Sequence, residues 1–169
     1  MAPDRPLKRH EVHLFWKTAS PFSQWHPATF EVDGVVYNCA EQYMMAEKAR
    51  LFGDYETEAA ILASGNPGKQ KALGRKVANF DETIWNERCR DVVFQGNLAK
   101  FSQNPDLMSC LLDTADRILV EASPVDAVWG IGLAEDDPRC LEPAQWRGTN
   151  WLGEVLTAVR AHIRESLGK

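Results

Sequence analysis

Segment 41–50, EQYMMAEKAR, has the residue spacing of a helix and is the strongest constraint on how this chain folds. Each residue advances about 100° around a helix, so Glu41, Met45 and Lys48 fall in one row, which Phe52 continues. The row is largely apolar and should face the interior, yet it carries an acid and a base roughly 10 Å apart along the axis. Because such charges are costly to bury unless they are paired or used, this row is the best functional clue in the sequence.

A purely structural explanation of the same residues is also open. Asn38 and Glu41 have the N-x-x-E spacing of a capping box, in which the acid bonds back to the start of its own helix. Lys48 can lay its methylene groups along apolar surface and bring its ammonium group to water. The pattern alone therefore leaves two interpretations of Glu41 and Lys48. Either Glu41 caps the helix and Lys48 lies at the surface, or both belong to a functional site.

The composition limits the class of protein. The chain has 169 residues, 44% of them hydrophobic, which predicts one domain with a core of its own. Lys and Arg number 19 against 24 Asp and Glu, and the net charge of −5 disfavours binding along a nucleic-acid backbone. The four cysteines lack C-x-x-C spacing and do not cluster with the four histidines, so we expect no metal or other cofactor. Without a secretory signal or a long apolar run, the sequence predicts a cytoplasmic protein that does not enter the membrane.

Local patterns predict a flexible tail over residues 1–10 and a single, predominantly helical α+β domain over residues 11–169. Helices are expected over residues 41–52, 54–63, 67–76, 83–102, 106–113 and 152–166, and strands over 12–16, 29–37 and 117–122. The second strand segment is a hairpin with an Asp33-Gly34 turn, and Val120 is expected to join this small antiparallel element. The buried stripe of the longest helix is expected to contain Ile84, Trp85, Cys89, Val92, Val93 and Leu98.

Two further segments carry candidate functional groups. Loop 20–27 contains Phe22 and Trp25, whose rings either stack on a flat base or, as is commoner, pack in the core. Glu121 and Asp126 follow a mostly buried strand, where acids often mark a functional site. A structural role for Asp126, as the cap of a short following helix, is equally compatible with the pattern.

A set of short blocks in a specific order along residues 13–165 carries a family resemblance. The blocks are FSQWHP (22–27), DGxxY (33–37), EQYMMAEKA (41–49), GR (74–75), Trp85, KF (100–101), LVEASPxD (119–126), WGIG (129–132) and WxGxNxLG (146–153). In this order they resemble the NADAR, or YbiA-like, superfamily. The family loop usually reads Leu-Ser-Asn-Phe where this chain has Phe22-Ser23-Gln24-Trp25, which leaves the substrate contacts of that loop open.

The resemblance implies an enzyme that cleaves N-glycosidic bonds. Some members of the family hydrolyse phosphoribosylamino-pyrimidine intermediates of riboflavin biosynthesis and release ribose 5-phosphate, and others remove ADP-ribose from guanine bases. The resemblance also implies that Glu41, Lys48, Glu121, Asp126 and Trp129 line the pocket.

The chemistry of the reaction suggests a role for each charged residue. Cleavage builds positive charge on the sugar and needs a carboxylate near the anomeric carbon and a positioned water. Glu41, kept ionised by the helix dipole, is expected to act as a base or charge stabiliser, and Asp126 to orient water or ribose hydroxyls. Glu121 binds the ribose or holds Lys48. Lys48 either anchors a negative group as a cation or attacks the sugar as a neutral amine.

The remaining contacts with the substrate are also candidates. Trp129, together with Phe22 or Trp85, is expected to stack on the base. The candidates for binding the sugar phosphate are Arg50, Lys69 and Arg75. Lys69 lies near the start of a basic helix, which either binds a phosphate there or only presents a basic face to solvent. Ser23 and Asn150 belong to matched blocks and are expected to contact the substrate.

Three functional hypotheses follow. The first is a glycosidase acting on a small phosphoribosylated pyrimidine, which the acidic net charge favours over a nucleic acid. The second is a hydrolase that releases ADP-ribose from modified guanine. The third is a non-catalytic module that binds a nucleotide or ADP-ribose, and measured turnover separates it from the first two.

Overall fold

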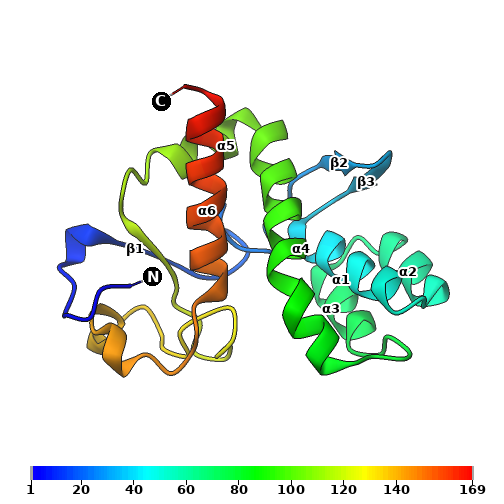
Figure 1. The fold of residues 1–169 in the computed structure, drawn as a ribbon, viewed down its shortest axis with the longest axis horizontal. Helices are drawn as coiled ribbons and strands as arrows, with labels where there is room; N and C mark the ends of the chain where they lie inside the picture. Colours follow the sequence, from blue (N-terminus) through cyan, green and yellow to red (C-terminus); the bar gives the residue numbers. More distant parts are fainter. Residues whose placement is uncertain (1, 169) are drawn as a thin grey trace. The chain divides into compact units, whose positions relative to one another are not determined.

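Six α-helices and four short strands account for most of residues 2–168, the part of the chain that the computed structural model describes (Figure 1). The helices are α1 (Ala40–Leu51), α2 (Tyr55–Leu62), α3 (Pro67–Gly74), α4 (Glu82–Gln103), α5 (Pro105–Leu112) and α6 (Trp151–Ser166). The strands are β1 (Val12–Phe15), β2 (Phe30–Val32), β3 (Val35–Tyr37) and β4 (Ile118–Glu121), and the short 3-10 helices are η1 (Arg9–Glu11), η2 (Pro138–Leu141) and η3 (Pro143–Gln145). The predicted helix-dominated α+β fold is therefore confirmed.

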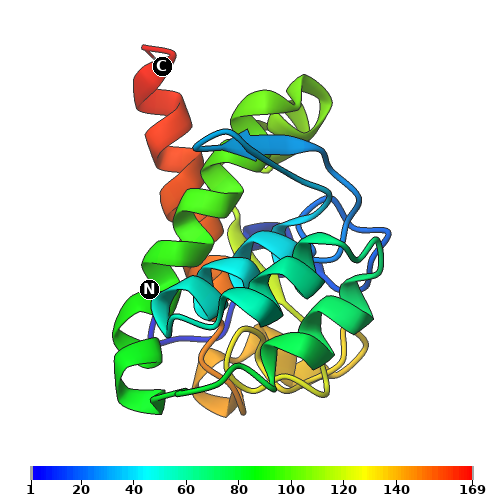
Figure 2. The ribbon, with the colours of Figure 1, turned by 90° about the vertical axis from the view of Figure 1, so that its right-hand side faces the viewer.

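The chain forms two compact units, and each has its own elements. Residues up to Ser23 and from Asp106 onward form the first unit, and Gln24–Pro105 form the second. In the second unit, α1 packs against α2, α3 and α4 (Figure 2). Glycines permit these contacts, since a Cβ at Gly74 would lie 1.9 Å from the Met45 sulfur and one at Gly96 would lie 2.5 Å from the Tyr43 ring.

Polar caps start three helices of the second unit, as the sequence predicts. The side chains of Asp54, Asn66 and Asp81 each accept a hydrogen bond of 3.0 Å from a backbone N–H in the first turn of α2, α3 and α4. The predicted capping box of α1 is wrong. Its N-cap is Cys39, which makes no side-chain cap, while Asn38 donates to the Ser64 carbonyl and accepts from Gln70.

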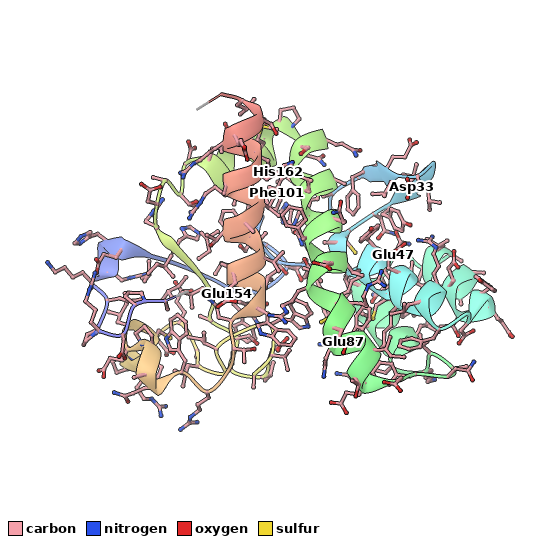
Figure 3. The ribbon with its side chains drawn as sticks, viewed as in Figure 1. Asp33, Glu47, Glu87, Phe101, Glu154 and His162 are labelled. Carbon is pink, nitrogen blue, oxygen red and sulfur yellow. The ribbon has the colours of Figure 1, made fainter. Side chains whose placement is uncertain are left out.

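The predicted hairpin is confirmed, and its turn lies at Asp33 (Figure 3). Asp33 and Gly34 both have positive φ, of 51° and 80°, as a tight turn between antiparallel strands requires. Most residues of the buried stripe predicted for α4 are at least partly buried. The prediction is wrong for Ile84, which is 44% exposed. Asn97 and Lys100 are buried instead.

The first unit is built around a parallel pair of strands. β1 and β4 pair from Val12 with Ile118 through Phe15 with Glu121. The expectation that Val120 joins the hairpin is therefore wrong, since the hairpin contains only β2 and β3. Val120 of this pair belongs to a buried hydrophobic cluster that also contains Ala122, Ile131, Leu133 and Cys140.

Helix α6 packs on β4 at very close range. A Cβ at Gly153 would lie 2.0 Å from the Leu119 carbonyl oxygen, so a larger residue cannot occupy this position without a shift of backbone. Leu7 lies within the segment predicted as a tail; its side chain is buried and its N–H donates to the Leu141 carbonyl at 2.7 Å. Among residues 2–168, the helices lack the combination of length and apolar character needed to cross a membrane.

Candidate active site

Glu41 is fixed in the first turn of α1 and is almost fully buried. Its side chain is 6% exposed, and its backbone N–H donates to the Gln24 carbonyl at 2.9 Å. The Gln24 side chain in turn accepts a hydrogen bond of 2.8 Å from the Asn97 amide of α4. Gln24, one of the loop residues at which the chain departs from the family pattern, thus holds the start of the helix that carries Glu41.

Lys48 lies two turns further along α1 and is covered by aromatic rings. Its ammonium nitrogen lies 4.4 Å from the centre of the Phe80 ring and 5.6 Å from that of Trp85. Burial and the nearby positive charge of Arg75 lower the pKa of Lys48, while the Glu41 carboxylate raises it. The predicted row therefore brings together, in one unit, an acid and an amine that influence each other electrostatically.

The sequence gives no sign that Phe80 covers Lys48. Phe80 is 45% exposed, and its ring contacts the edge of Phe52 with 5.4 Å between ring centres. It follows Asn79, which has a positive φ, in the linker before α4, where helical periodicity predicts nothing. Trp85, by contrast, belongs to the predicted buried stripe of α4 and is buried.

The candidate phosphate-binding cations differ in their availability. Arg50 donates to the Tyr37 hydroxyl and to Glu58, each at 2.8 Å, and also pairs with Glu47. These bonds raise the pKa of Arg50 and commit its guanidinium group to the unit itself. Arg75 and Lys69 are exposed. Of the three candidate cations, Arg75 is the one whose positive charge lowers the pKa of Lys48.

In the first unit, Asn150 holds the end of β4 that carries Glu121. The Asn150 side chain accepts a hydrogen bond from the Glu121 N–H and donates one to the Leu119 carbonyl, each 3.0 Å long. Its φ of 53° is left-handed, a conformation that asparagine tolerates better than most residues. The Glu121 carbonyl accepts from the Ile131 N–H. Asn150, predicted to contact substrate, therefore has both of its amide atoms engaged with the backbone of β4.

Asp126 organises the loop that carries Trp129. One carboxylate oxygen accepts hydrogen bonds from the N–H groups of Val128, at 2.9 Å, and Trp129, at 2.8 Å. A turn rather than a helix follows, so the helix-capping alternative is wrong. The ring of Trp129 contacts the edge of Trp151 with 5.7 Å between ring centres. Both hydrogen bonds of the Asp126 side chain within residues 2–168 are made by Oδ1.

Phe22 and Ser23 are buried in the structure. Phe22 is 3% exposed, and its ring packs edge-on against those of His13 and Phe15, with ring centres 5.0 and 5.5 Å apart. Of the two roles that the sequence leaves for Phe22, the packing role is the one observed. Ser23 is also buried.

The predicted site residues thus form two sets. Gln24–Pro105 contains Glu41, Lys48, Arg50, Arg75 and Trp85, and the other unit contains Phe22, Ser23, Glu121, Asp126, Trp129 and Asn150. In Gln24–Pro105 the structure brings the Lys48 amine close to the rings of Phe80 and Trp85 and under the influence of the Glu41 carboxylate. In the other unit, Asn150 bonds to the end of β4, and Asp126 fixes the position of Trp129 through a hydrogen bond to its N–H.

Comparison with known proteins tests the family resemblance. The family model for the NADAR domain matches residues 14–164. The chain is 47% identical over 144 residues to "N-glycosidase R617" of Acanthamoeba polyphaga mimivirus, covering 82% of this chain and 85% of that protein. It is 42% identical over 166 residues to "Protein irg-1" of Caenorhabditis elegans, covering 89% of this chain and 78% of that protein.

The fold and a more distant relative agree with this result. The NMR structure of the E. coli protein YbiA matches with a TM-score of 0.76 at 26% identity, covering 99% of this chain and 96% of that chain. "Riboflavin biosynthesis protein PYRR, chloroplastic" of Zea mays is 28% identical over 162 residues, which are 88% of this chain and 24% of that protein. By sequence and by fold, this chain belongs to the NADAR domain family and, with relatives named N-glycosidases, is a hydrolase acting on N-glycosyl compounds.

Proposed function

We propose that this NADAR protein hydrolyses the N-glycosidic bond of phosphoribosylamino-pyrimidine intermediates of riboflavin biosynthesis, releasing ribose 5-phosphate and the free base. The observation that carries the proposal is the row of α1, in which buried Glu41 and ring-covered Lys48 share one face. A buried acid and an amine with a lowered pKa are the groups from which acid–base and nucleophilic chemistry is built.

The reaction balances with water as the only co-substrate. The bond between the anomeric carbon and the amine nitrogen breaks, and its electron pair leaves with the nitrogen, which takes up a proton. The oxygen of water bonds to the anomeric carbon, and Glu41 accepts the proton that the water loses and returns it to the solvent, which supplies the proton taken up by the nitrogen. The negative charge of Glu41 also stabilises the positive charge that develops on the sugar.

Lys48 has two roles compatible with this scheme. As a cation it pairs with a negative group of the substrate. As a neutral amine it attacks the anomeric carbon and forms an imine, which water then hydrolyses to regenerate the lysine. The lowered pKa supports the second role, because it increases the fraction of neutral amine near neutral pH. Reduction with borohydride during turnover tests it, since a trapped imine adds the mass of the sugar to Lys48.

The choice of substrate rests on charge and on the names of relatives. Relatives from Zea mays, Vibrio vulnificus and Arabidopsis thaliana are named riboflavin biosynthesis proteins. A net charge of −5 favours a small metabolite over a polymeric nucleic acid. We assign the sugar phosphate to Arg75 and the base to Trp85, both in the unit that contains Glu41 and Lys48.

The decisive experiment is to incubate the purified protein with the phosphoribosylamino-uracil intermediate and quantify ribose 5-phosphate. Glu41→Gln removes the charge of the buried acid, and Glu56→Gln makes the same change at an exposed position of α2. We expect release by the wild type and by Glu56→Gln, and a loss of at least 100-fold in Glu41→Gln. Full turnover by a folded Glu41→Gln variant would remove Glu41 from the mechanism.

The same assay separates the alternatives. If the wild type releases no ribose 5-phosphate, the proposed substrate is wrong, and ADP-ribosylated guanine is the next substrate to test. Saturable binding of both compounds without turnover of either would contradict the enzymatic function and identify a binding module.

A further inference from the structure

The first unit contains a cavity of about 640 Å³ that the proposed reaction does not use. Its walls come from β4, α6, the segment 143–146 and the N-terminal residues 2–4. Glu121, Asp126 and Trp129 do not line it. The cavity is therefore distinct from the acids and the tryptophan assigned to the N-glycosidase reaction, although Asn150 borders it.

Arg160 of α6 lines this cavity and makes no ion pair within residues 2–168. The residue is 5% exposed, and its Nη1 donates to the Thr114 hydroxyl at 2.7 Å and to the Arg117 carbonyl at 3.0 Å. Across residues 2–168 no carboxylate lies within 4 Å of its guanidinium group, and Nε and Nη2 make no hydrogen bond. One turn further on, Arg164 pairs with Asp116 at 2.9 Å.

A buried guanidinium group without a counter-ion is an expensive arrangement. Arginine stays protonated in proteins, and a buried charge requires a partner to offset its lost hydration. Burial and the charges of Arg164 and Arg117 lower the pKa of Arg160, and the more distant Asp116 carboxylate opposes them only in part, because the net direction is down. Its remaining N–H groups, on Nε and Nη2, form the edge that matches two oxygens of a carboxylate or phosphate.

The other residues of the cavity restrict what fits. Arg117 supplies a second guanidinium group, which donates only to the Asp113 and Thr114 carbonyls and has no carboxylate partner within residues 2–168. Trp146 and Ile118 provide apolar wall. Three exposed acids also line the cavity, Glu154 near the start of α6 (Figure 3), Asp4 and Asp116, and they oppose entry of a polyanion.

From this arrangement we propose that the cavity binds a small metabolite through a single oxyanion group, a phosphate monoester or a carboxylate, with Arg160 as the anchor. The uncharged part of the ligand lies against Trp146 and Ile118. This site is independent of the N-glycosidase function, so each stands or falls by its own experiment.

Inorganic phosphate and acetate are the probes, titrated at constant ionic strength with chloride as the balancing anion. The indole N–H of Trp146, which donates to the Cys140 carbonyl, is the reporter in ¹H–¹⁵N NMR spectra of the full chain. We expect a saturable shift of this signal with one of the two probes, and the probe that binds identifies the group as phosphate or carboxylate. The shift should persist in Lys48→Met, which alters only the proposed reaction.

Two variants and a control decide the role of the cavity. Arg160→Gln should weaken binding at least tenfold, whereas Arg164→Gln, which removes a neighbouring arginine that does not line the cavity, should not. If Arg160→Gln fails to fold, Ala144→Trp blocks the cavity from an exposed position and should abolish the shift. No saturable shift with either probe, or binding that survives Ala144→Trp, would overturn the proposal.

Discussion

The ammonium nitrogen of Lys48 lies 4.4 Å from the centre of the Phe80 ring, which is itself 45% exposed. The ring has two opposing effects on Lys48: its π face stabilises the charged amine, and its bulk keeps water away. Burial is the largest cause of the lowered pKa of Lys48, and the Phe80 ring is one of the groups that cover the amine. The protonation of Lys48 therefore depends on a side chain outside α1.

Phe80→Ala should raise the pKa of Lys48 toward its ordinary value, because it restores water to the amine. Phe80→Leu, which keeps apolar cover, should raise it less. The direct measurement is an NMR titration of the Lys48 side chain, and the pH profile of kcat/KM should move in the same direction. Ile84→Ala removes a similarly exposed apolar side chain nearby in sequence and serves as the control. An unchanged Lys48 titration in Phe80→Ala would show that other groups set its pKa.

Substitutions of Arg75 and Arg50 should have different effects on steady-state kinetics. Arg75→Gln should raise KM for a phosphoribosyl substrate at least about tenfold, since a charge-assisted hydrogen bond contributes roughly 1.5–3 kcal/mol. Arg50→Gln should lower the melting temperature by breaking the pairs with Glu47 and Glu58, with KM unchanged. A raised KM in Arg50→Gln alone would reverse the two roles.

Asp126→Asn should lower kcat on the order of 100-fold without loss of stability. Asparagine keeps the oxygen that accepts from the N–H groups of Val128 and Trp129, so the turn is preserved and only the charge is lost. Thermal unfolding and turnover should be measured on the same preparation, with Asp136→Asn as an exposed control. Unaltered kcat would restrict Asp126 to organising the Trp129 loop.

Lys100 should make stability depend on pH. Burial lowers the pKa of Lys100 to about 7, whereas in the unfolded chain it titrates near its ordinary value of 10.5. Between these values the unfolded chain holds a proton that the folded chain has released, so this lysine's contribution makes stability rise with pH across that window. Below pH 7 both states are protonated, and the cost of burial is present in full.

The comparison with Lys100→Met isolates this contribution. Chemical unfolding from pH 6 to pH 10 should show the wild type gaining a few kcal/mol relative to the variant, at about 1.36 kcal/mol for each unit of pKa difference. A stability difference that stays constant with pH would mean that Lys100 titrates alike in both states.

Gly153→Ala should destabilise the protein by about 2 kcal/mol or more, since the new methyl group would lie 2.0 Å from the Leu119 carbonyl oxygen. Gly65→Ala is the matched control, because a Cβ there meets nothing within 4 Å. Equal melting temperatures for the two variants would show that α6 moves off β4 at little cost.

The sequence predicts most helices and the hairpin because their signals are local. Asp54, Asn66 and Asp81 cap the helices that follow them within three residues, and Asp33-Gly34 supplies the turn that its conformation requires. The pairing of β1 with β4 joins residues more than 100 positions apart in strands of four residues. Strands this short have too few alternating positions to indicate a partner, and Val120 is consequently misassigned.

The candidate site shows the same division. Glu41 and Lys48 follow from helical periodicity, a property of one segment. The cover of Lys48 by Phe80 arises from the tertiary packing of a linker without periodicity. Of the partners of Arg50, only Glu47, three residues earlier in α1, is visible in the local pattern; Tyr37 and Glu58 lie on other elements.

Asn150 meets three requirements at once: a left-handed backbone, an acceptor facing the Glu121 N–H, and a donor facing the Leu119 carbonyl. Aspartate lacks the donor, glycine lacks both groups, and glutamine is one methylene longer. None of these requirements concerns bond cleavage. The block that contains Asn150 is thus a signature of architecture, and a search keyed to it gathers proteins of this build whether or not they are enzymes.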